Sequence, residues 1–354
     1  MRALNIRNIQ KIDKKNMLGI LIDFPQQCEM ALEIANQTEF LFTERNFNKI
    51  IFAGMGGSAI GGDLVRAYLY ENLDLPVMVF REYSLPAFID KDTLMFISSY
   101  SGNTEETLSC YQQAKEKNAT IIALSSGGKL KELCLQDKNT FIQIPQGLPP
   151  RCALGYLSLI PLRILERIGI IKISKQQEYR ETISVLNELK NKQLSPKIAT
   201  ERNLAKFLAS KIFNRIPLLY TSSLHFDVVV SRFRAQLNEN AKTLALSNLL
   251  PEMNHNEIEG FKNIKKFAKH LVAIFLIDSG IHPRVQKRIE ISQGLIKDCG
   301  VPVFEIHSQG KSLLSRIFSL IYTGDFISFY LAILYKTDPT PVEIISLLKE
   351  RLKE

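Results

Sequence analysis

The stretch Ser98-Ser99-Tyr100-Ser101-Gly102-Asn103-Thr104-Glu105-Glu106-Thr107 directly follows the apolar run Leu94-Met95-Phe96-Ile97. This order predicts a strand, a turn rich in hydroxyl groups and a helix whose first turn is acidic. The first N–H groups of a helix have no intrahelical partners and lie at the positive end of its dipole, so a phosphate fits there. The stretch is therefore a candidate phosphate loop, with further donors in Ser99, Ser101 and Thr104. A turn that Thr104 simply caps is the alternative.

A second loop of the same kind lies earlier in the chain. The apolar stretch 49–53 leads into Gly54-Met55-Gly56-Gly57-Ser58, and an apolar helical pattern follows. Its glycine spacing departs from G-x-G-x-x-G, and Asp74, near the distance expected of a ribose ligand, falls in a loop. Neither loop contains the Gly-Lys-Ser/Thr of a nucleotide P-loop. Two such loops favour one phosphate monoester over a nucleotide.

Apolar runs and helical patterns alternate along both halves of the chain, which is typical of parallel sheets covered by helices. The first half predicts strands at 49–53, 76–80, 93–98, 119–124 and 140–144, and helices at 58–70, 104–117 and 129–136. The second half predicts strands at 216–220, 270–276 and 301–306, and helices at about 225–241 and 283–298. The expected fold is α/β, with two doubly wound domains that repeat each other. We assign 1–150 to the first domain, 151–205 to a helical connection and 206–354 to the second domain.

Composition excludes several classes of protein. The chain has 354 residues, of which 45% are hydrophobic and 23% charged. Its net charge of +9 is dispersed over the sequence, so we expect an attraction for anionic substrates and no nucleic-acid partner. We expect no secretory leader, and no apolar run approaches the roughly twenty residues of a membrane span; the longest lies near 326–334. Five cysteines and five histidines show no ligand spacing, which predicts reduced thiols, a cytoplasmic location and no metal.

Three polar segments supply candidate chemistry. Two prolines precede Arg151 and fix the approach to a guanidinium that could meet an anion or a developing oxyanion. Glu239 lies between two asparagines, which are poor residues for a helix interior, and it is a candidate general base. His255 also lies between two asparagines and could transfer protons near neutral pH. A domain boundary, a solvated helix and a solvated loop, respectively, are the alternative interpretations.

These segments together resemble the sugar isomerase (SIS) fold, and within it the bifunctional phosphoglucose/phosphomannose isomerases. The similarity spans nearly the whole chain in the family's order. It is carried by 54–58, 98–107, Pro149-Pro150-Arg151, Gln236-Leu237-Asn238-Glu239-Asn240-Ala241-Lys242, Asn254-His255-Asn256-Glu257 and the tail from Asp338 through Lys349. The stretch from Arg151 to Glu239, with its charged tract at 170–200, is longer than in compact members of the family.

The resemblance implies specific roles for these residues. A sugar phosphate would be bound by Gly56, Gly57, Ser58, Ser99, Ser101 and Thr104. Glu239 would move a proton between C1 and C2, Arg151 would stabilise the enediolate, and His255 and Lys349 would assist ring opening. The resemblance also implies a homodimer in which two subunits complete each other's sites, and it implies no metal or other cofactor.

Two alternatives remain at this stage. A strict glucose-6-phosphate isomerase would reject the C2 epimer, and Thr340 is a plausible contributor to the pocket wall that decides this. A regulatory SIS protein would keep the serine loops but need no base. Because Glu239, His255 and Lys349 are all present, the sequence favours an enzyme.

Overall fold

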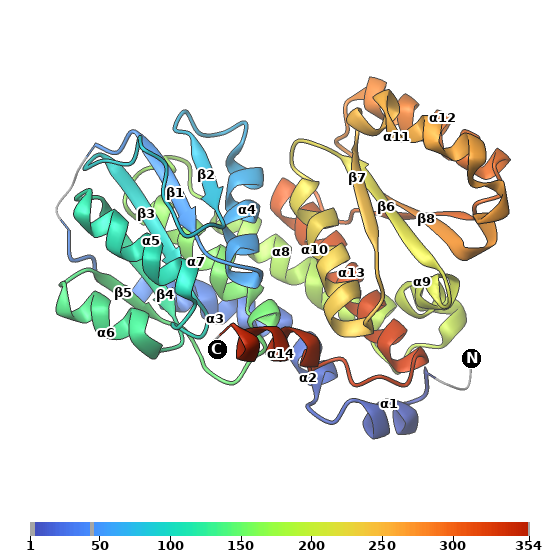
Figure 1. Cartoon of the computed structure of the whole chain (residues 1–354), viewed down its shortest axis with the longest axis horizontal. Coiled ribbons are helices and arrows are strands. Elements are labelled where there is room, and N and C mark those ends of the chain that lie inside the picture. The colour runs from blue at the N-terminus through green and yellow to red at the C-terminus, as the bar shows by residue number, and fades with distance from the viewer. Residues whose placement is uncertain (1–3, 43–45, 353–354) are drawn as a thin grey trace. The chain divides into compact units, whose positions relative to one another are not determined.

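The computed structural model describes residues 4–42 and 46–352. Its residues form two compact units (Figure 1). Unit 1 comprises Met1–Ile22 and Ser184–Glu354, and unit 2 comprises Asp23–Ile183. The chain passes from unit 1 to unit 2 after Ile22 and returns within helix α8 (Gln176–Leu189), which contains much of the charged tract.

Unit 2 is built on a five-stranded parallel sheet in the order β2-β1-β3-β4-β5. The central strands are buried along their whole length, as expected of a sheet covered on both faces. The strands are β1 (Lys49–Ala53), β2 (Val77–Phe80), β3 (Thr93–Ser98), β4 (Thr120–Ser125) and β5 (Thr140–Gln143). All five predicted strands of the first half are therefore present, with boundaries shifted by one residue at most.

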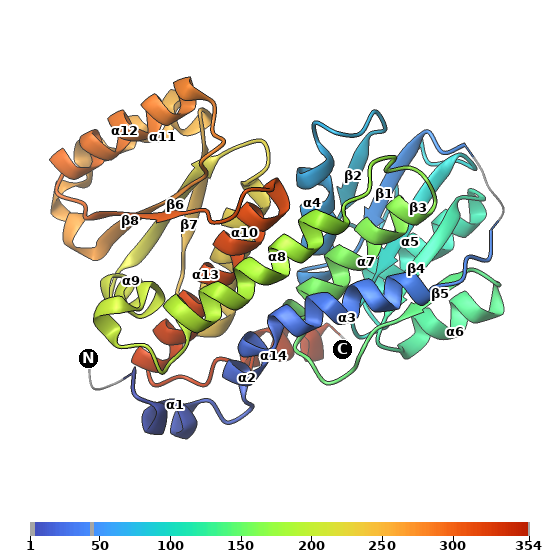
Figure 2. The same cartoon turned by 180° about the vertical axis from the view of Figure 1, so that it is seen from behind.

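Helices cover both faces of this sheet. In Figure 1, α5 (Glu105–Glu116) and α6 (Gly128–Gln136) lie on the near face. Figure 2 shows α3 (Phe24–Gln37) and α7 (Leu154–Arg167) on the opposite face, together with α4 (Gly57–Leu69). The predicted helices at 58–70, 104–117 and 129–136 correspond to α4, α5 and α6.

Unit 1 contains a four-stranded parallel sheet in the order β7-β6-β8-β9. Its strands are β6 (Ile216–Ser222), β7 (Leu246–Leu250), β8 (Leu271–Ile277) and β9 (Val303–His307). The first four strands of unit 2 have the same order, so the two sheets repeat one topology. The predicted class, two α/β domains with parallel sheets, is confirmed. Strand β7 was not predicted.

The helices of unit 1 form two layers around the sheet. On one face lie α9 (Leu204–Ile212), α10 (Asp227–Ala241) and α13 (Leu313–Leu334). On the other, α11 (Glu257–Gly260) and α12 (Pro283–Asp298) contribute Ile258, Ile289 and Ile296 to the core. The predicted helices at 225–241 and 283–298 are α10 and α12.

Helix α13 corrects one expectation from the sequence. It has 22 residues, and by length and composition it is the one helix among the described residues that could cross a membrane. The sequence shows no apolar run of such length because Arg316 and Asp325 interrupt it. In the folded unit, 94% of its most apolar window is buried, so α13 is a core helix.

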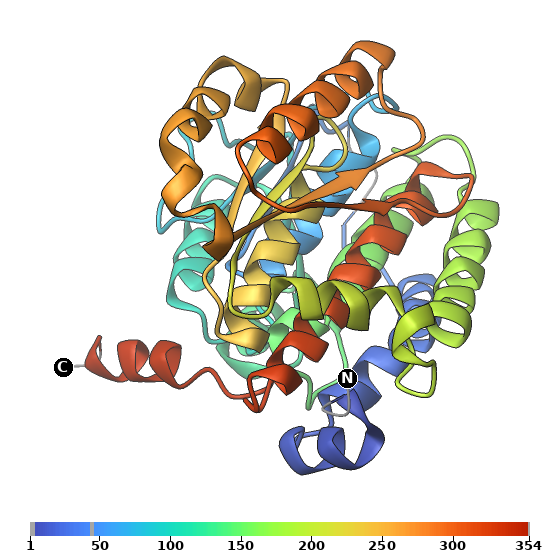
Figure 3. The ribbon, with the colours of Figure 1, turned by 90° about the vertical axis from the view of Figure 1, so that its right-hand side faces the viewer.

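The terminal segments both belong to unit 1. Helices α1 (Ile6–Ile12) and α2 (Met17–Ile22) pack against α13, and the Tyr322 hydroxyl donates to the Leu21 carbonyl at 2.7 Å. The compact units therefore do not follow the chain order 1–150, 151–205 and 206–354. Helix α14 (Glu343–Arg351) follows α13 and has no buried residue; Figure 3 shows it extending away from the sheet of its unit.

Candidate active site

The two glycine and serine loops lie at the switch point of the unit 2 sheet. Strands β1 and β3 are neighbours, and the connection after β1 leads to β2 while the connection after β3 leads to β4 on the other side. Ligands of open α/β sheets bind where neighbouring connections diverge in this way, outside the carboxyl ends of the strands. The predicted phosphate loops 54–58 and 98–104 occupy this position.

The first loop brings the backbone close to another segment. Gly56 has a φ of 51°, in the left-handed region that favours glycine, and it precedes α4 without a side-chain cap. A Cβ at Gly57 would lie 2.8 Å from the Pro150 carbonyl and 3.0 Å from the Cα of Arg151. Only glycine fits between α4 and this segment. The start of α4, with its helix-terminal N–H groups, therefore lies beside the backbone of Arg151.

The second loop is tied to the first by hydroxyl groups. The buried Ser58 hydroxyl accepts from the Tyr100 N–H at 3.2 Å. Ser99 Oγ accepts from the Gly102 N–H at 3.1 Å and donates to Thr104 Oγ1 at 2.9 Å. Thr104 precedes α5 without a side-chain capping bond. The Ser101 hydroxyl lies on an exposed residue.

A third loop supports the second, and it was not predicted from the sequence. Strand β4 ends at Ser125, and Ser126 and Gly127 lead into α6, which begins at Gly128. Asn103 Oδ1 accepts from the Lys129 N–H at 3.0 Å. A Cβ at Gly102 would collide with the Gly127 carbonyl oxygen, so the two turns touch through their backbones. The signal was available, since the loop repeats the pattern of hydroxyl groups and glycines after a buried strand.

Arg151 lies next to these loops within unit 2. Its side chain is buried, in the short helix η2 (Pro150–Cys152). The hydroxyl of Tyr100, in the second loop, accepts from the Leu148 N–H at 2.8 Å and donates to the Pro145 carbonyl at 2.9 Å. These bonds fix the approach to the two prolines. The predicted phosphate residues and Arg151 thus form one cluster.

Glu239, His255 and Lys349 belong to unit 1. Glu239 is half-buried in the last turn of α10 and lines a groove of about 520 Å³. The other wall of the groove comes from 337–345, where the chain turns into α14. Lys242, at the end of α10, donates to the carbonyls of Glu239 at 2.5 Å and Pro341 at 2.6 Å. The C-terminal segment is therefore held against the helix that carries Glu239.

His255 and Glu239 lie at opposite ends of strand β7 in the unit 1 sheet. Glu239 precedes β7 by a short turn, whereas His255 ends the short helix η5 (Glu252–His255), which follows β7. The five-residue strand between them spans roughly 16 Å. His255 is exposed. Lys349 is also exposed, on α14, whose first turn lines the same groove as Glu239.

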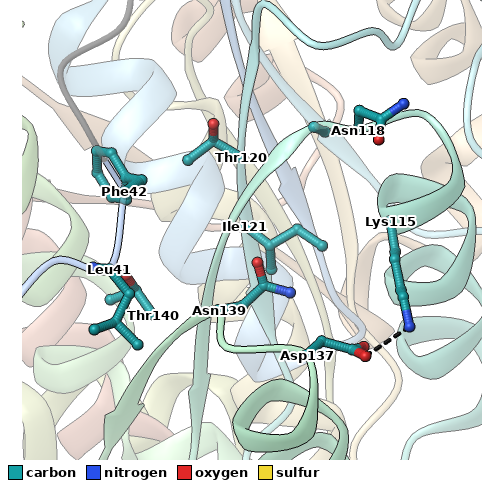
Figure 4. Close-up of a pocket in the computed structure, with 10 residues that line it drawn as sticks. Leu41, Phe42, Lys115, Asn118, Thr120, Ile121, Asp137, Asn139 and Thr140 are labelled. Atoms are coloured by element: carbon teal, nitrogen blue, oxygen red, sulfur yellow. Dashed lines mark hydrogen bonds and ion pairs between the residues drawn. The ribbon is translucent and has the colours of Figure 1, made fainter.

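A different pocket, of about 460 Å³, lies at the amino-terminal edge of the unit 2 sheet (Figure 4). Thr120 and Thr140, which begin β4 and β5, contribute to its lining. Lys115 Nζ lies 2.6 Å from Asp137 Oδ1, and this bond holds the pKa of the carboxyl below its ordinary value. The phosphate loops lie at the carboxyl edge, so this pocket is not part of their cluster.

Metal ligands do not converge in the part of the chain that the structure describes: no group of three or more His, Cys, Asp or Glu side chains could hold an ion. The five cysteines are free thiols, and four of them are buried.

Comparison with known proteins defines the class. Residues 45–142 match the SIS domain family, and residues 201–352 match the bacterial phospho-glucose isomerase C-terminal SIS domain. A hypothetical protein from Thermus thermophilus superimposes with a TM-score of 0.75 at 15% identity, over 98% of this chain and 94% of that one. For the C-terminal domain of glucosamine-fructose-6-phosphate aminotransferase from Francisella tularensis, the TM-score is 0.69 at 13% identity, over 92% and 97%. The fold is that of a two-domain SIS protein.

Sequence relatives narrow the class to one family. A bifunctional phosphoglucose/phosphomannose isomerase from Caldicellulosiruptor bescii is 43% identical over 339 residues, which is 96% of this chain and 99% of the relative. Another from Aquifex aeolicus is 33% identical over 87% of this chain and 91% of the relative. The chain belongs to the bifunctional phosphoglucose/phosphomannose isomerase family and is an isomerase. The predicted resemblance is confirmed.

Proposed function

We propose that the protein interconverts glucose 6-phosphate and mannose 6-phosphate with fructose 6-phosphate. The observation that carries the proposal is the cluster of two uncapped helix N-termini, loop hydroxyls and Arg151 at the switch point of unit 2. It offers donors for a phosphate monoester, and the backbone of Arg151, which carries a permanent cation, lies beside the start of α4. The family membership supports the choice of sugar phosphates as substrates.

The phosphate end would be bound by the backbone N–H groups of Gly56 and Gly57 and by Ser101 and Thr104. Ser58 and Ser99 support this arrangement from within the loops, and Ser99 holds Thr104 through its 2.9 Å bond. Binding one end of a six-carbon chain in this way restricts the position of C1 and C2, which turns proton transfer into a step between groups already in place.

Proton transfer is assigned to Glu239. Its carboxylate removes the C2 proton of the open-chain aldose, the electron pair moves into a C1–C2 double bond, and the carbonyl oxygen becomes an enediolate oxygen. Arg151 stabilises that negative charge. The O2 hydroxyl proton then passes to O1, Glu239 returns its proton to C1, and the carbonyl forms at C2. Glucose 6-phosphate and mannose 6-phosphate differ only at C2, so both yield the same enediolate.

Ring opening precedes this step. The hydroxyl proton at C1 must leave and the ring oxygen must gain a proton. His255 can transfer protons near neutral pH, and Lys349 is a cationic donor on the helix that starts beside Glu239. We assign these two side chains to ring opening.

The positions of Glu239 and His255 support a homodimer with shared sites. In one chain they lie at opposite edges of a sheet, and the strand between them is roughly 16 Å long. One sugar cannot reach both ends of this strand, whereas His255 of a second copy can approach the site that contains Glu239. The homodimer therefore supplies both residues to one substrate.

One assay tests the function. The purified chain is incubated with glucose 6-phosphate or mannose 6-phosphate in EDTA, and fructose 6-phosphate is measured. We expect turnover of both aldoses, unchanged by the chelator. Turnover of glucose 6-phosphate alone would identify a strict isomerase, and binding without turnover would identify a regulatory protein.

A further inference from the structure

The two asparagines that flank His255 each donate a side-chain hydrogen bond, and His255 does not. Asn254 Nδ2 donates to Ser292 Oγ of α12 at 2.7 Å. Asn256 Nδ2 donates to Glu252 Oε1 at 2.8 Å. Among the described residues, His255 itself forms no hydrogen bond or ion pair and is exposed. Its imidazole is thus presented to solvent by a segment that is otherwise held.

Glu257, two residues after His255, anchors this segment to the sheet. Tyr220 of β6 donates its hydroxyl to Glu257 Oε1 at 2.6 Å, and Asn248 Nδ2 of β7 donates to Glu257 Oε2 at 2.7 Å. Tyr220 is fully buried. Both carboxylate oxygens therefore bond to neighbouring strands of the sheet, and charge-assisted bonds of this kind are stronger than neutral ones.

The phenol is suited to this bond. Burial raises the pKa of Tyr220, and the hydrogen bond to Glu257 raises it further, so the hydroxyl remains a donor. The Glu257 N–H in turn donates to Asn256 Oδ1 at 2.6 Å, which fixes the turn between η5 and α11. Movement of Glu257 would therefore move the residue next to His255.

We propose that Glu257 is a positioning residue that fixes the orientation of His255 through Tyr220 and Asn248. This inference rests on the proposed function, in which His255 assists ring opening. Glu257 does not touch the sugar; it holds the backbone from which His255 extends. A displacement of about 1 Å at a reacting group costs on the order of a hundredfold in rate, so such support affects turnover.

Three substitutions test the proposal. Glu257→Ala removes both bonds to the sheet, whereas Glu257→Gln can still pair with Asn248 and Tyr220 because the phenol can also accept. Glu259→Ala is the matched control, since Glu259 lies on the same short helix with its side chain 82% exposed. We expect kcat for glucose 6-phosphate to fall by about tenfold to a hundredfold in Glu257→Ala. Glu257→Gln should lie between it and the wild type, with Glu259→Ala unchanged. KM should change little, because the phosphate is bound elsewhere.

A double variant separates positioning from general damage. If Glu257 acts through His255, then His255→Gln/Glu257→Ala is no slower than His255→Gln alone. If the two losses multiply instead, the proposal is overturned. Should Glu257→Ala fail to fold, Tyr220→Phe removes one of the two bonds while keeping the ring, and it should show the same dependence on His255.

A spectroscopic readout does not depend on activity. With carbon-labelled histidine, the signal of the His255 imidazole is identified by its absence in His255→Gln. We expect this signal to shift or broaden in Glu257→Ala and to stay unchanged in Glu259→Ala. An unchanged signal in Glu257→Ala would overturn the proposal. A wild-type chain that turns over neither aldose would instead overturn the proposed function, and the spectra would still decide whether Glu257 holds His255.

Discussion

Two hydroxyl groups of the phosphate loops are engaged inside the protein. Ser58 accepts from the Tyr100 N–H, and Ser99 links Gly102 to Thr104. Their bonds fix the loops, whereas Ser101 is exposed. Residues of one type in one motif thus divide between buried and exposed positions, although Ser101 Oγ also accepts from the Asn103 N–H at 3.3 Å. That division depends on which hydroxyl points inward, which the sequence pattern does not specify.

If Glu239 is the base, its substitution should slow the chemical step and leave ligand binding almost unchanged. Glu239→Gln keeps the size of the side chain but cannot accept the C2 proton. We expect kcat to fall by about a hundredfold to ten-thousandfold. Binding of sorbitol 6-phosphate, which has no carbonyl to isomerise, should stay within about twofold in calorimetry, because the phosphate contacts are untouched.

The control for this prediction lies in the same groove. Glu343 also lines it, at the start of α14, and Glu343→Gln should leave kcat near that of the wild type. Near-normal turnover by Glu239→Gln would remove Glu239 from the mechanism. Equal losses in both variants would mean that the charge of the groove, and not a specific base, matters.

At the scale of elements, helix α10 is oriented by a buried polar face. Arg232, Gln236 and Asn240 recur every four residues and so share one side of the helix. Arg232 pairs with Asp325 of α13 at 2.7 Å, and Gln236 donates to the same carboxylate at 2.9 Å. Asn240 donates to Ser328 Oγ at 2.9 Å. This face fixes the rotation of α10, and with it the direction in which Glu239 points.

The network predicts an unequal response to single and double substitutions. Arg232 and Asp325 are both almost fully buried. Asp325→Ala leaves a buried guanidinium unpaired, and we expect it to lower the free energy of unfolding by about 3–5 kcal/mol. Arg232→Met/Asp325→Leu removes both charges and should lose less. Urea denaturation of each variant measures the difference.

A surface pair provides the control. Lys192 and Glu188 form an ion pair at 2.7 Å with side chains 70% and 54% exposed. Glu188→Ala should change the free energy of unfolding by less than about 1 kcal/mol. If the double variant is less stable than Asp325→Ala, burial of an unpaired charge is not the cause of the loss.

Strands and helices were predicted where the sequence has a continuous apolar run or a helical repeat. Two elements without such a pattern were missed. The buried strands β1, β3 and β4 are continuous apolar runs. Strand β7, Leu-Ser-Asn-Leu-Leu, is a partly exposed edge without such a run. Helix α13 is buried on all sides, so it has no polar face to reveal a helical repeat. Neither element could be predicted from a single sequence, because β7 has no apolar run and α13 shows no helical repeat.

At the scale of the whole molecule, the chain order does not determine which residues pack together. Helix α2 packs in unit 1 because it contacts α13, about three hundred residues later in the chain. The candidate site was predicted residue by residue through motifs. The separation of Glu239 from His255 became visible only when β7 placed them at opposite edges of one sheet.

That separation predicts that two inactive chains can restore activity to each other. Glu239→Gln and His255→Gln should each be nearly inactive alone. After mixing under conditions that exchange subunits, half of the dimers are hybrids. In each hybrid, the Glu239 of one chain meets the His255 of the other at one of the two sites. Activity should therefore recover to about a quarter of the wild-type value, as expected for a symmetric dimer.

The matched control mixes Glu239→Gln with the double variant Glu239→Gln/His255→Gln. Those hybrids have no Glu239, so they should stay inactive. Subunit exchange is verified separately by mass spectrometry of differently labelled chains. If exchange is complete and the first mixture stays inactive, His255 does not act in the neighbour's site. Glu239 and His255 must then approach each other within one chain. Recovery to a quarter would assign each site to one Glu239 and one His255 from different copies, and the dimer would be the smallest active form.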